Sequence, residues 1–154
     1  DVTGVQTCAL PILIGGQSID LYYENREISI AKLNEMHDRK TGALIKASLE
    51  AGAIIAKASK SDIKRMGDYG ELIGRAFQIT DDILDIKGSK EKMGKTIGKD
   101  VNNNKSTYIT YYGLDKSIEI ALDTVNKAKE IIGLYDDKAK LFIELANYIF
   151  SRDS

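Results

Sequence analysis

Apolar residues recur along most of this chain at the three- and four-residue spacing of amphipathic helices, and no segment alternates as a β-strand would. Polar capping residues and glycines divide this pattern. Ser29 is expected to begin one helix, Ser61 or Asp62 a long one, and Asp115 a later one. The expected helices cover residues 30–38, 41–57, 62–86, 107–112, 115–135 and 137–151. The sequence therefore predicts an all-α fold without an internal repeat or a domain boundary.

Three glycines, Gly67, Gly70 and Gly74, follow one another at i, i+3 and i+7 in the long helix. Glycine costs a helix roughly 1 kcal/mol per site relative to alanine. Close approach by a neighbouring helix would offset this cost, so we expect one to pack directly on the stripe. The alternative is a weakened stripe that faces solvent.

Residues 87–105 form the only long irregular stretch, which is polar and contains Gly88, Gly94 and Gly98. Long loops in compact domains are often functional. This stretch directly follows an acidic segment, so we expect it to form a lid over that segment.

The acidic segment is AFQITDDILD, residues 76–85, which places Asp81, Asp82 and Asp85 on the long helix. Asp81 and Asp85 lie about one turn apart on nearly the same face. Carboxylates placed in this way can bind a hard divalent cation. The same pattern also occurs on solvated acidic helix faces, so the surrounding motifs decide between the two interpretations.

Four further motifs surround this segment: GGQSID (15–20), HDRKTGAL (37–44), GKTIGKD (94–100) and KSTY (105–108). In this order and at these spacings, the five motifs resemble the C-terminal half of the trans-isoprenyl diphosphate synthases (polyprenyl synthetases). The bacterial farnesyl and geranylgeranyl diphosphate synthases are most similar, from about Leu13 to the end of the chain. The resemblance implies part of the isoprenoid synthase helical bundle, with residues 76–85 as the second aspartate-rich motif.

The family's first aspartate-rich motif, which is followed by paired arginines, has no counterpart here. Asp136 and Asp137 form the only other adjacent acidic pair, but they lie late in the chain and lack the arginines. We therefore expect residues 13–154 to be the C-terminal fragment of a single polyprenyl synthetase domain, inactive alone. Product length, which the family sets largely near the first motif, stays open among geranyl, farnesyl and geranylgeranyl products.

Residues 1–12, DVTGVQTCALPI, share nothing with the family pattern. From Val2 onward they resemble the translation of a common sequencing-adapter oligonucleotide. We expect the protein's own sequence to begin near Leu13 and exclude the preceding residues from the fold argument. They hold the single cysteine, Cys8, and the single proline, Pro11.

The resemblance implies that Asp81 and Asp85 bind Mg²⁺, with Asp82 contributing through water or by supporting the ligands. It also implies that Lys40, Lys95 and Lys105 bind the diphosphate of the substrate. Metal ions and cationic side chains together neutralise the charge that grows on the leaving diphosphate.

The other implied site residues surround the prenyl chain. Thr41 and Gln78 would place oxygens near the allylic carbons, Phe77 would form a pocket wall, and Gln17 would lie near the prenyl-chain cavity. In the family reaction, an allylic diphosphate (dimethylallyl or geranyl) ionises first. The double bond of isopentenyl diphosphate then attacks the cation, and a proton is lost. Water must be excluded, because it would quench the cation.

Composition limits the partners of the chain. The net charge of −1 argues against a nucleic-acid partner or an acidic membrane surface. A single cysteine permits no intrachain disulfide, which fits a cytoplasmic location. The apolar residues 8–16 are too short to cross a bilayer, so we expect no transmembrane segment. By family resemblance, the complete protein is expected to be a homodimer.

Two other functions remain possible at this point. One is a non-catalytic helical subunit of a heteromeric prenyl diphosphate synthase, although a purely structural partner would not need the acidic motif and its lysines. The other is a fragment of a terpene cyclase, which shares the fold and the ionisation step. The HDRKTGAL and GKTIGKD segments argue against a cyclase, which usually carries a different second metal motif.

Overall fold

The computed structural model describes residues 2–24, 26–93 and 107–152, and all regular structure within these ranges is helical. The elements are α1 (Val2–Tyr22), α2 (Ile30–His37), η1 (Asp38–Gly42), α3 (Ala43–Ile55), α4 (Lys60–Met93), α5 (Tyr108–Tyr112), α6 (Leu114–Gly133), η2 (Asp136–Ala139) and α7 (Lys140–Ser151). The predicted all-α fold is confirmed.

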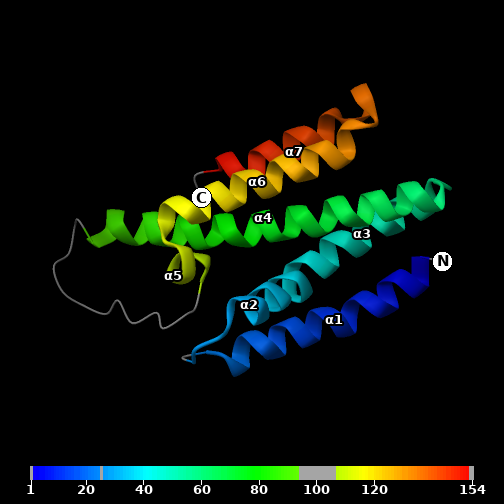
Figure 1. Ribbon diagram of the computed structural model, residues 1–154. Helices are drawn as coiled ribbons and strands as arrows, with labels where there is room; N and C mark the ends of the chain where they lie inside the picture. The colour runs from blue at the N-terminus through cyan, green and yellow to red at the C-terminus, as the bar shows by residue number, and fades with distance from the viewer. Residues whose placement is uncertain (1, 25, 94–106, 153–154) are drawn as a thin grey trace.

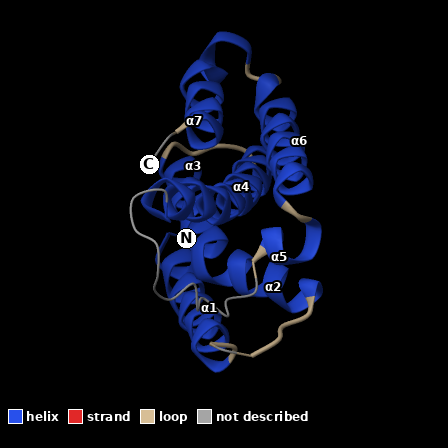
Figure 2. Cartoon of the chain, turned by 90° about the vertical axis from the view of Figure 1, so that its left-hand side faces the viewer, coloured by secondary structure: helices blue, strands red, loops and turns tan. Residues whose placement is uncertain are grey.

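Helix α4 runs through the middle of the molecule and packs against most of the other helices (Figure 1). Helices α1, α2 and α3 lie on one side of it, whereas α6 and α7 lie on the other (Figure 1). The second view shows α1 and α2 separated by α4 from α6 and α7 (Figure 2). The short α5 packs beside α4 and α6. Helix α4 therefore contacts elements from both the earlier and the later part of the described chain.

The core consists of two apolar clusters that both include α4. In the first, Tyr69 and Ile73 of α4 pack with Val125 and Ile132 of α6 and Ile149 of α7. In the second, further along α4, the buried residues are Ile28, Leu33, Met36, Ile79, Ile83, Tyr108 and Ala121. The acidic segment contains Ala76 of the first cluster and Ile79 and Ile83 of the second, so its backbone is held on two sides.

The predicted helix starts agree with the structure in part. Ser29 caps α2, as predicted, because its side chain accepts a hydrogen bond from the Lys32 backbone N–H. The long helix begins two residues earlier than predicted, at Lys60, because the Ser59 hydroxyl accepts a hydrogen bond from the Asp62 N–H at 3.2 Å. It also continues to Met93, past the predicted stop at Gly88. Gly88 has no left-handed backbone angle and therefore does not end the helix.

The later helices lie close to their predicted positions. Thr107 caps α5 through a reciprocal pair of hydrogen bonds with Thr110, and the predicted short helix at 107–112 is confirmed. Helix α6 begins directly after Gly113, whose φ of 76° is a left-handed conformation that favours glycine. The predicted loop at 87–105 is wrong over its first part, because α4 continues to Met93. The lid prediction for the remainder lies outside the described residues.

One predicted break is absent. The sequence pattern suggested separate helices over 30–38 and 41–57, whereas α2, η1 and α3 follow one another without an interruption. The HDRKTG segment that joins them forms a π-helical turn, Asp38–Gly42. A π turn inserts one extra residue into a helix and is frequent at functional sites. The extra residue turns the side chains of Lys40 and Thr41 toward different sides of the helix than they would have in a regular α-helix.

The glycine stripe of α4 meets α3 and the π turn directly, as predicted. A Cβ atom added at Gly74 would lie 2.6 Å from the Cα of Gly42, and one at Gly70 would lie 2.9 Å from the Cα of Lys46. A Cβ at Gly67 would meet the Glu50 carboxylate. The close backbone approach explains why glycine is tolerated within α4, and it excludes the alternative of a solvent-facing stripe.

Helix α1 is 21 residues long, and by length and composition it could cross a bilayer. The expectation of no transmembrane segment rested on residues 8–16 alone, and the helix extends beyond them in both directions. A single such helix is weak support for a membrane span, because core helices of water-soluble proteins meet the same criterion. Within the described structure, α1 packs on α3 and the η1 turn. The adapter origin of residues 1–12 stays a prediction.

Candidate metal and diphosphate site

The three aspartates of the acidic segment of α4, Asp81, Asp82 and Asp85, face in two directions. At about 100° per residue, Asp81 and Asp85 each lie within about 20° of the direction of Gly74, so they continue the glycine stripe. Asp82 instead points toward α5, where its carboxylate accepts a hydrogen bond of 3.0 Å from the Tyr108 backbone N–H. Asp81 and Asp85 are therefore the pair that the helix presents together, and Asp82 holds the start of α5 in place.

The described part of the chain contains no group of three or more His, Cys, Asp or Glu side chains that could hold a metal ion by itself. Mg²⁺ commonly binds through one or two carboxylates, with substrate phosphates and water supplying the remaining ligands. The pair Asp81 and Asp85 matches this second mode of binding, in which the substrate completes the metal site.

A positive group already lies against this pair. The Arg152 guanidinium, from the residue that ends α7, forms an ion pair with the Asp81 carboxylate. It also lies 4.0 Å above the centre of the Phe77 ring and donates a hydrogen bond to the Phe77 carbonyl. A cationic group therefore occupies the position beside Asp81, and a metal ion bound to Asp81 would occupy the same position.

Burial dominates the electrostatics of Asp81. It raises the pKa of this carboxyl above its usual value, and the nearby Asp85 acts in the same direction, while Arg152 opposes both. A half-buried carboxylate beside a second, exposed one favours a bound cation, since the cation offsets the burial of Asp81 and its repulsion from Asp85. The electrostatics therefore agree with cation binding at this pair.

Lys40 lies on the π turn, across from α1. Its ammonium forms an ion pair of 2.5 Å with Asp20. The backbone of the two elements is equally close, because a Cβ added at Gly16 would lie 2.4 Å from the Lys40 amide nitrogen. Both Lys40 and Asp81 are thus neutralised by a partner within the described chain.

The other predicted site residues that the structure describes lie on three different elements, α4, η1 and α1. Gln78 is half-buried on α4, on the stripe that carries Asp81, and Thr41 is half-buried in the π turn. Gln17 is exposed on α1. The phosphate-binding predictions for Lys95 and Lys105 lie outside the described residues.

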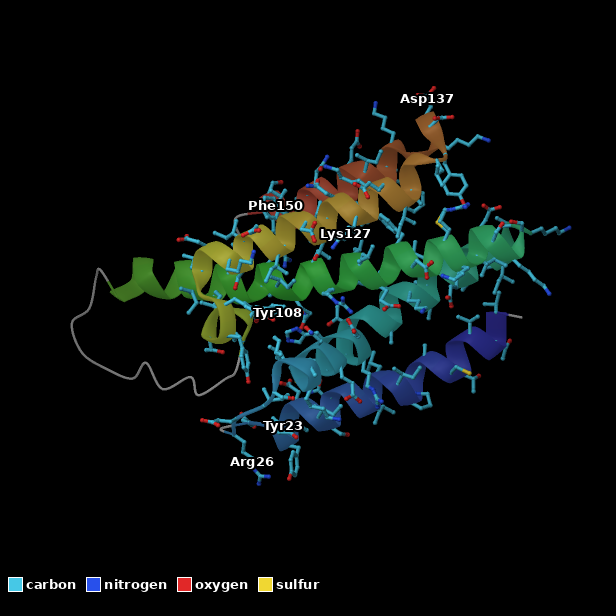
Figure 3. The ribbon with its side chains drawn as sticks, in the orientation of Figure 1. Tyr23, Arg26, Tyr108, Lys127, Asp137 and Phe150 are labelled. Carbon is cyan, nitrogen blue, oxygen red and sulfur yellow. The ribbon has the colours of Figure 1, made fainter. Side chains whose placement is uncertain are left out.

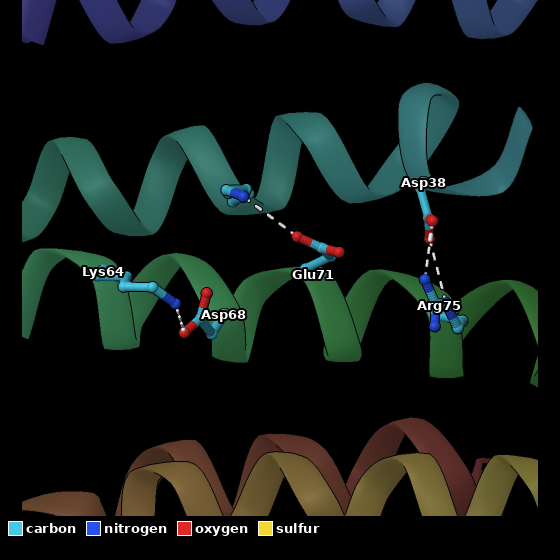
Figure 4. Close-up of polar contacts among 6 residues, drawn as sticks. Asp38, Lys64, Asp68, Glu71 and Arg75 are labelled. Carbon is cyan, nitrogen blue, oxygen red and sulfur yellow. Dashed lines mark hydrogen bonds and ion pairs between the residues drawn. The ribbon is translucent and has the colours of Figure 1, made fainter. Parts of the chain in front are cut away.

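Sequence reasoning missed a polar cluster between α2, η1, α4 and α5. Arg75 binds Asp38 through two hydrogen bonds, of 3.2 and 2.8 Å, which join α4 to the start of the π turn (Figure 4). The Tyr108 hydroxyl donates to Asn34, and its ring stacks on His37 at 5.7 Å between centroids. Tyr108 lies where α5 meets α4 (Figure 3). The position of Asp38 inside HDRKTGAL was the one available signal.

His37 is buried in this cluster, and its Nδ1 atom has no hydrogen-bond partner within the described chain. Burial lowers the pKa of His37 to about 4, and the positive charge of Lys40 acts in the same direction. The neutral imidazole is therefore the form that the fold accommodates.

We expect acidification to destabilise the protein through His37. The pKa of His37 is lower in the folded than in the unfolded state. The contribution of the neutral imidazole to the free energy of unfolding is therefore fully present above pH 6.5 and is lost as the pH falls toward 4. The free energy of unfolding should be about 1 kcal/mol lower at pH 5.5 than at pH 6.5. Denaturant titrations at both pH values measure this difference, and His37→Gln should remove most of it. An unchanged difference in the variant would assign the pH dependence to other groups.

Comparison with known proteins places this geometry in a family. A family model described as polyprenyl synthetase matches residues 1–142. The geranylgeranyl diphosphate synthase of Cyanophora paradoxa is 43% identical over 143 residues, which cover 92% of this chain and 48% of that protein. The farnesyl diphosphate synthase of Bacillus subtilis (strain 168) is 39% identical over 141 residues, with the same two shares.

Comparison of the fold with solved structures indicates the same family. A crystal structure of polyprenyl synthase from Caulobacter crescentus CB15, complexed with calcium and isoprenyl diphosphate, matches 99% of this chain and 59% of that chain. The TM-score is 0.83 at 25% sequence identity. The present chain spans about half the length of the curated relatives it matches. The motif order, the helical arrangement and the family match agree along nearly the whole sequence, and this chain belongs to the polyprenyl synthetase family.

Proposed function

We propose that this chain supplies the second metal-binding and diphosphate-binding half of a prenyltransferase. The complete enzyme would condense an allylic diphosphate, dimethylallyl or geranyl, with isopentenyl diphosphate in isoprenoid biosynthesis. The observation that carries the proposal is the pair Asp81 and Asp85, presented together on α4, with a cationic group already bound to Asp81. Family membership supports the reaction class.

Asp81 and Asp85 would hold Mg²⁺ through their carboxylate oxygens. When bound, Mg²⁺ supplies a Lewis acid that neutralises the charge developing on the departing diphosphate. Lys40 would exchange Asp20 for a phosphate oxygen, and Lys95 and Lys105 would donate to the remaining ones. The calcium and isoprenyl diphosphate of the Caulobacter crescentus relative support a cation and a diphosphate as ligands of this class of site.

The apolar side of the site would protect the reacting carbons. Gln78 lies one turn before Asp81 and Asp82 on α4, and Thr41 lies in the π turn that packs on Gly74 of the same helix. Their oxygens would face the allylic carbons and stabilise the developing positive charge. Phe77 would close one wall against water, and Gln17 would lie toward the prenyl chain.

Exposed apolar side chains support the interpretation as part of a larger body. Ile14 and Leu21 on α1 and Leu141 and Tyr148 on α7 are all largely exposed. Apolar surface of this extent usually packs against another part of a protein. The remaining half would cover such surface and would contribute the first aspartate-rich motif and the isopentenyl diphosphate site. The expected homodimer of the complete protein stays a prediction.

The proposal is tested by comparing the complete protein with the chain described here. Each is incubated with dimethylallyl diphosphate, labelled isopentenyl diphosphate and Mg²⁺, and prenyl products are identified by mass spectrometry. We expect elongated products from the complete protein, none with a chelator, and none from the 154-residue chain. Clear turnover by the short chain would refute its inactivity, and no turnover by the complete protein would refute the proposed reaction.

A further inference from the structure

Arg152 has an unusual position for a residue near the end of a chain. Only 12% of its side chain is exposed, and it reaches from the end of α7 to the middle of α4. Its backbone N–H donates to the Tyr148 carbonyl at 3.0 Å, which fixes the start of the side chain to α7. The guanidinium therefore joins the C-terminal helix to the candidate metal ligand.

The Arg152 guanidinium has hydrogen-bond acceptors for one of its nitrogens but, among the described residues, none for another. One terminal nitrogen binds both Asp81 and the Phe77 carbonyl, while the buried Nε has no hydrogen-bond partner within the described chain. A buried donor without an acceptor is unfavourable. The contact is therefore one that a better ligand of Asp81 can displace, in contrast to the contact between Arg75 and Asp38, in which Nε and one terminal nitrogen both bind the carboxylate.

The charges around Asp81 determine which ligand can displace the Arg152 guanidinium from this carboxylate. Arg152 is the cation that acts on Asp81, and Asp85 is the neighbouring acid. A divalent cation bound to both carboxylates would occupy the position of the guanidinium and would repel it. Metal and guanidinium are thus alternative ligands of the same carboxylate.

We propose that Arg152 acts as an internal latch, which neutralises Asp81 when no metal is bound and leaves when a divalent cation binds. The end of α7 would then be held while the site lacks metal and released when metal is bound. This inference rests on the proposed metal-binding role of Asp81. It makes Arg152 a positioning residue that lowers metal affinity and couples metal binding to the C-terminus.

The first test measures the affinity for Mn²⁺, a paramagnetic substitute for Mg²⁺, in the complete protein by electron paramagnetic resonance. The relevant site is the one that Asp81→Asn removes. Arg152→Gln should raise the affinity of this site about fivefold, because the competing ion pair is partly screened by solvent. An unchanged affinity in Arg152→Gln would overturn the latch while the metal assignment stands. Unchanged Mn²⁺ binding in Asp81→Asn would overturn the metal assignment itself, and the latch with it.

Arg65→Gln is the matched control. Arg65 also forms an ion pair with an aspartate, Asp62, three residues earlier on α4, at 3.0 Å, and lies near an aromatic ring, that of Tyr135, at 5.5 Å. It lies about 24 Å from Asp81 along the helix axis. We expect this variant to bind Mn²⁺ as the wild type does.

The second test does not depend on affinity. Hydrogen exchange of the C-terminal peptide that includes residues 145–152 is followed by mass spectrometry. Saturating Mn²⁺ should accelerate exchange in this peptide, since release of the side chain weakens the bond from the Arg152 N–H to Tyr148. In Arg152→Gln, exchange should be fast with or without metal. Slower exchange on adding Mn²⁺ would overturn the latch.

Discussion

Replacement of Asp81 by Asn in the complete enzyme should lower kcat/KM at least about 100-fold, which corresponds to roughly 2.7 kcal/mol of transition-state stabilisation. The amide has nearly the size of the carboxylate, so α4 and its core contacts should persist. It lacks the negative charge that would bind Mg²⁺, and the diphosphate would then leave without full neutralisation. Steady-state assays across Mg²⁺ concentrations measure the effect, and part of the loss should be recovered at high Mg²⁺.

Asp68→Asn provides the control for this experiment. Asp68 is also an acid of α4, but it pairs with Lys64 one turn away, remote from the site (Figure 4). Its replacement should leave kcat/KM within about twofold, because an exposed pair of this kind contributes little. If Asp81→Asn retained activity within about tenfold of the wild type, or roughly 1.4 kcal/mol, the metal assignment would be wrong.

Gly74→Ala should destabilise the protein by roughly 2 kcal/mol. The added methyl carbon would lie 2.6 Å from the Cα and 3.0 Å from the N of Gly42, and both are backbone atoms that cannot rotate away. Helix α4 would have to move from the π turn, which carries Lys40 and Thr41. The thermal midpoint should fall by about 4–8 °C, and activity should fall with it because the two halves of the site separate.

Gly88→Ala is the control that separates the steric clash at Gly74 from the general effect of replacing a helical glycine by alanine. Gly88 also lies within α4, and no atom lies within 4 Å of a Cβ added there. Alanine should therefore stabilise the helix at this position by about 0.5–1 kcal/mol. Opposite shifts of the thermal midpoint in the two variants are expected. A loss of stability in Gly88→Ala as large as that in Gly74→Ala would mean that close packing is not the cause.

Local features of the fold could be predicted from the sequence because neighbouring residues determine them. Ser29 marks a helix start by its own capping hydrogen bond, and the spacing of Gly67, Gly70 and Gly74 indicates a close helix contact. The π turn could not be predicted in this way. A pattern of period 3.6 does not show where one extra residue is inserted, so the pattern at HDRKTG predicts a break between two helices instead of a π turn.

The candidate site was predicted as a set of residues but not as an arrangement. Spacing placed Asp81 and Asp85 on one face, and the structure agrees with that placement. Spacing did not show that Asp82 supports α5, nor that Arg152 binds Asp81 across 71 positions of sequence. Such contacts depend on how α4, α5 and α7 pack, and no local pattern encodes them.

The most direct test of the central claim is a crystal structure of the complete protein with Mn²⁺ and a non-reactive allylic diphosphate analogue. Anomalous scattering locates the metal. We predict Mn²⁺ about 2.1 Å from carboxylate oxygens of Asp81 and Asp85, with diphosphate oxygens completing its coordination. Mn²⁺ and diphosphate bound together at a position that neither aspartate contacts would contradict the account.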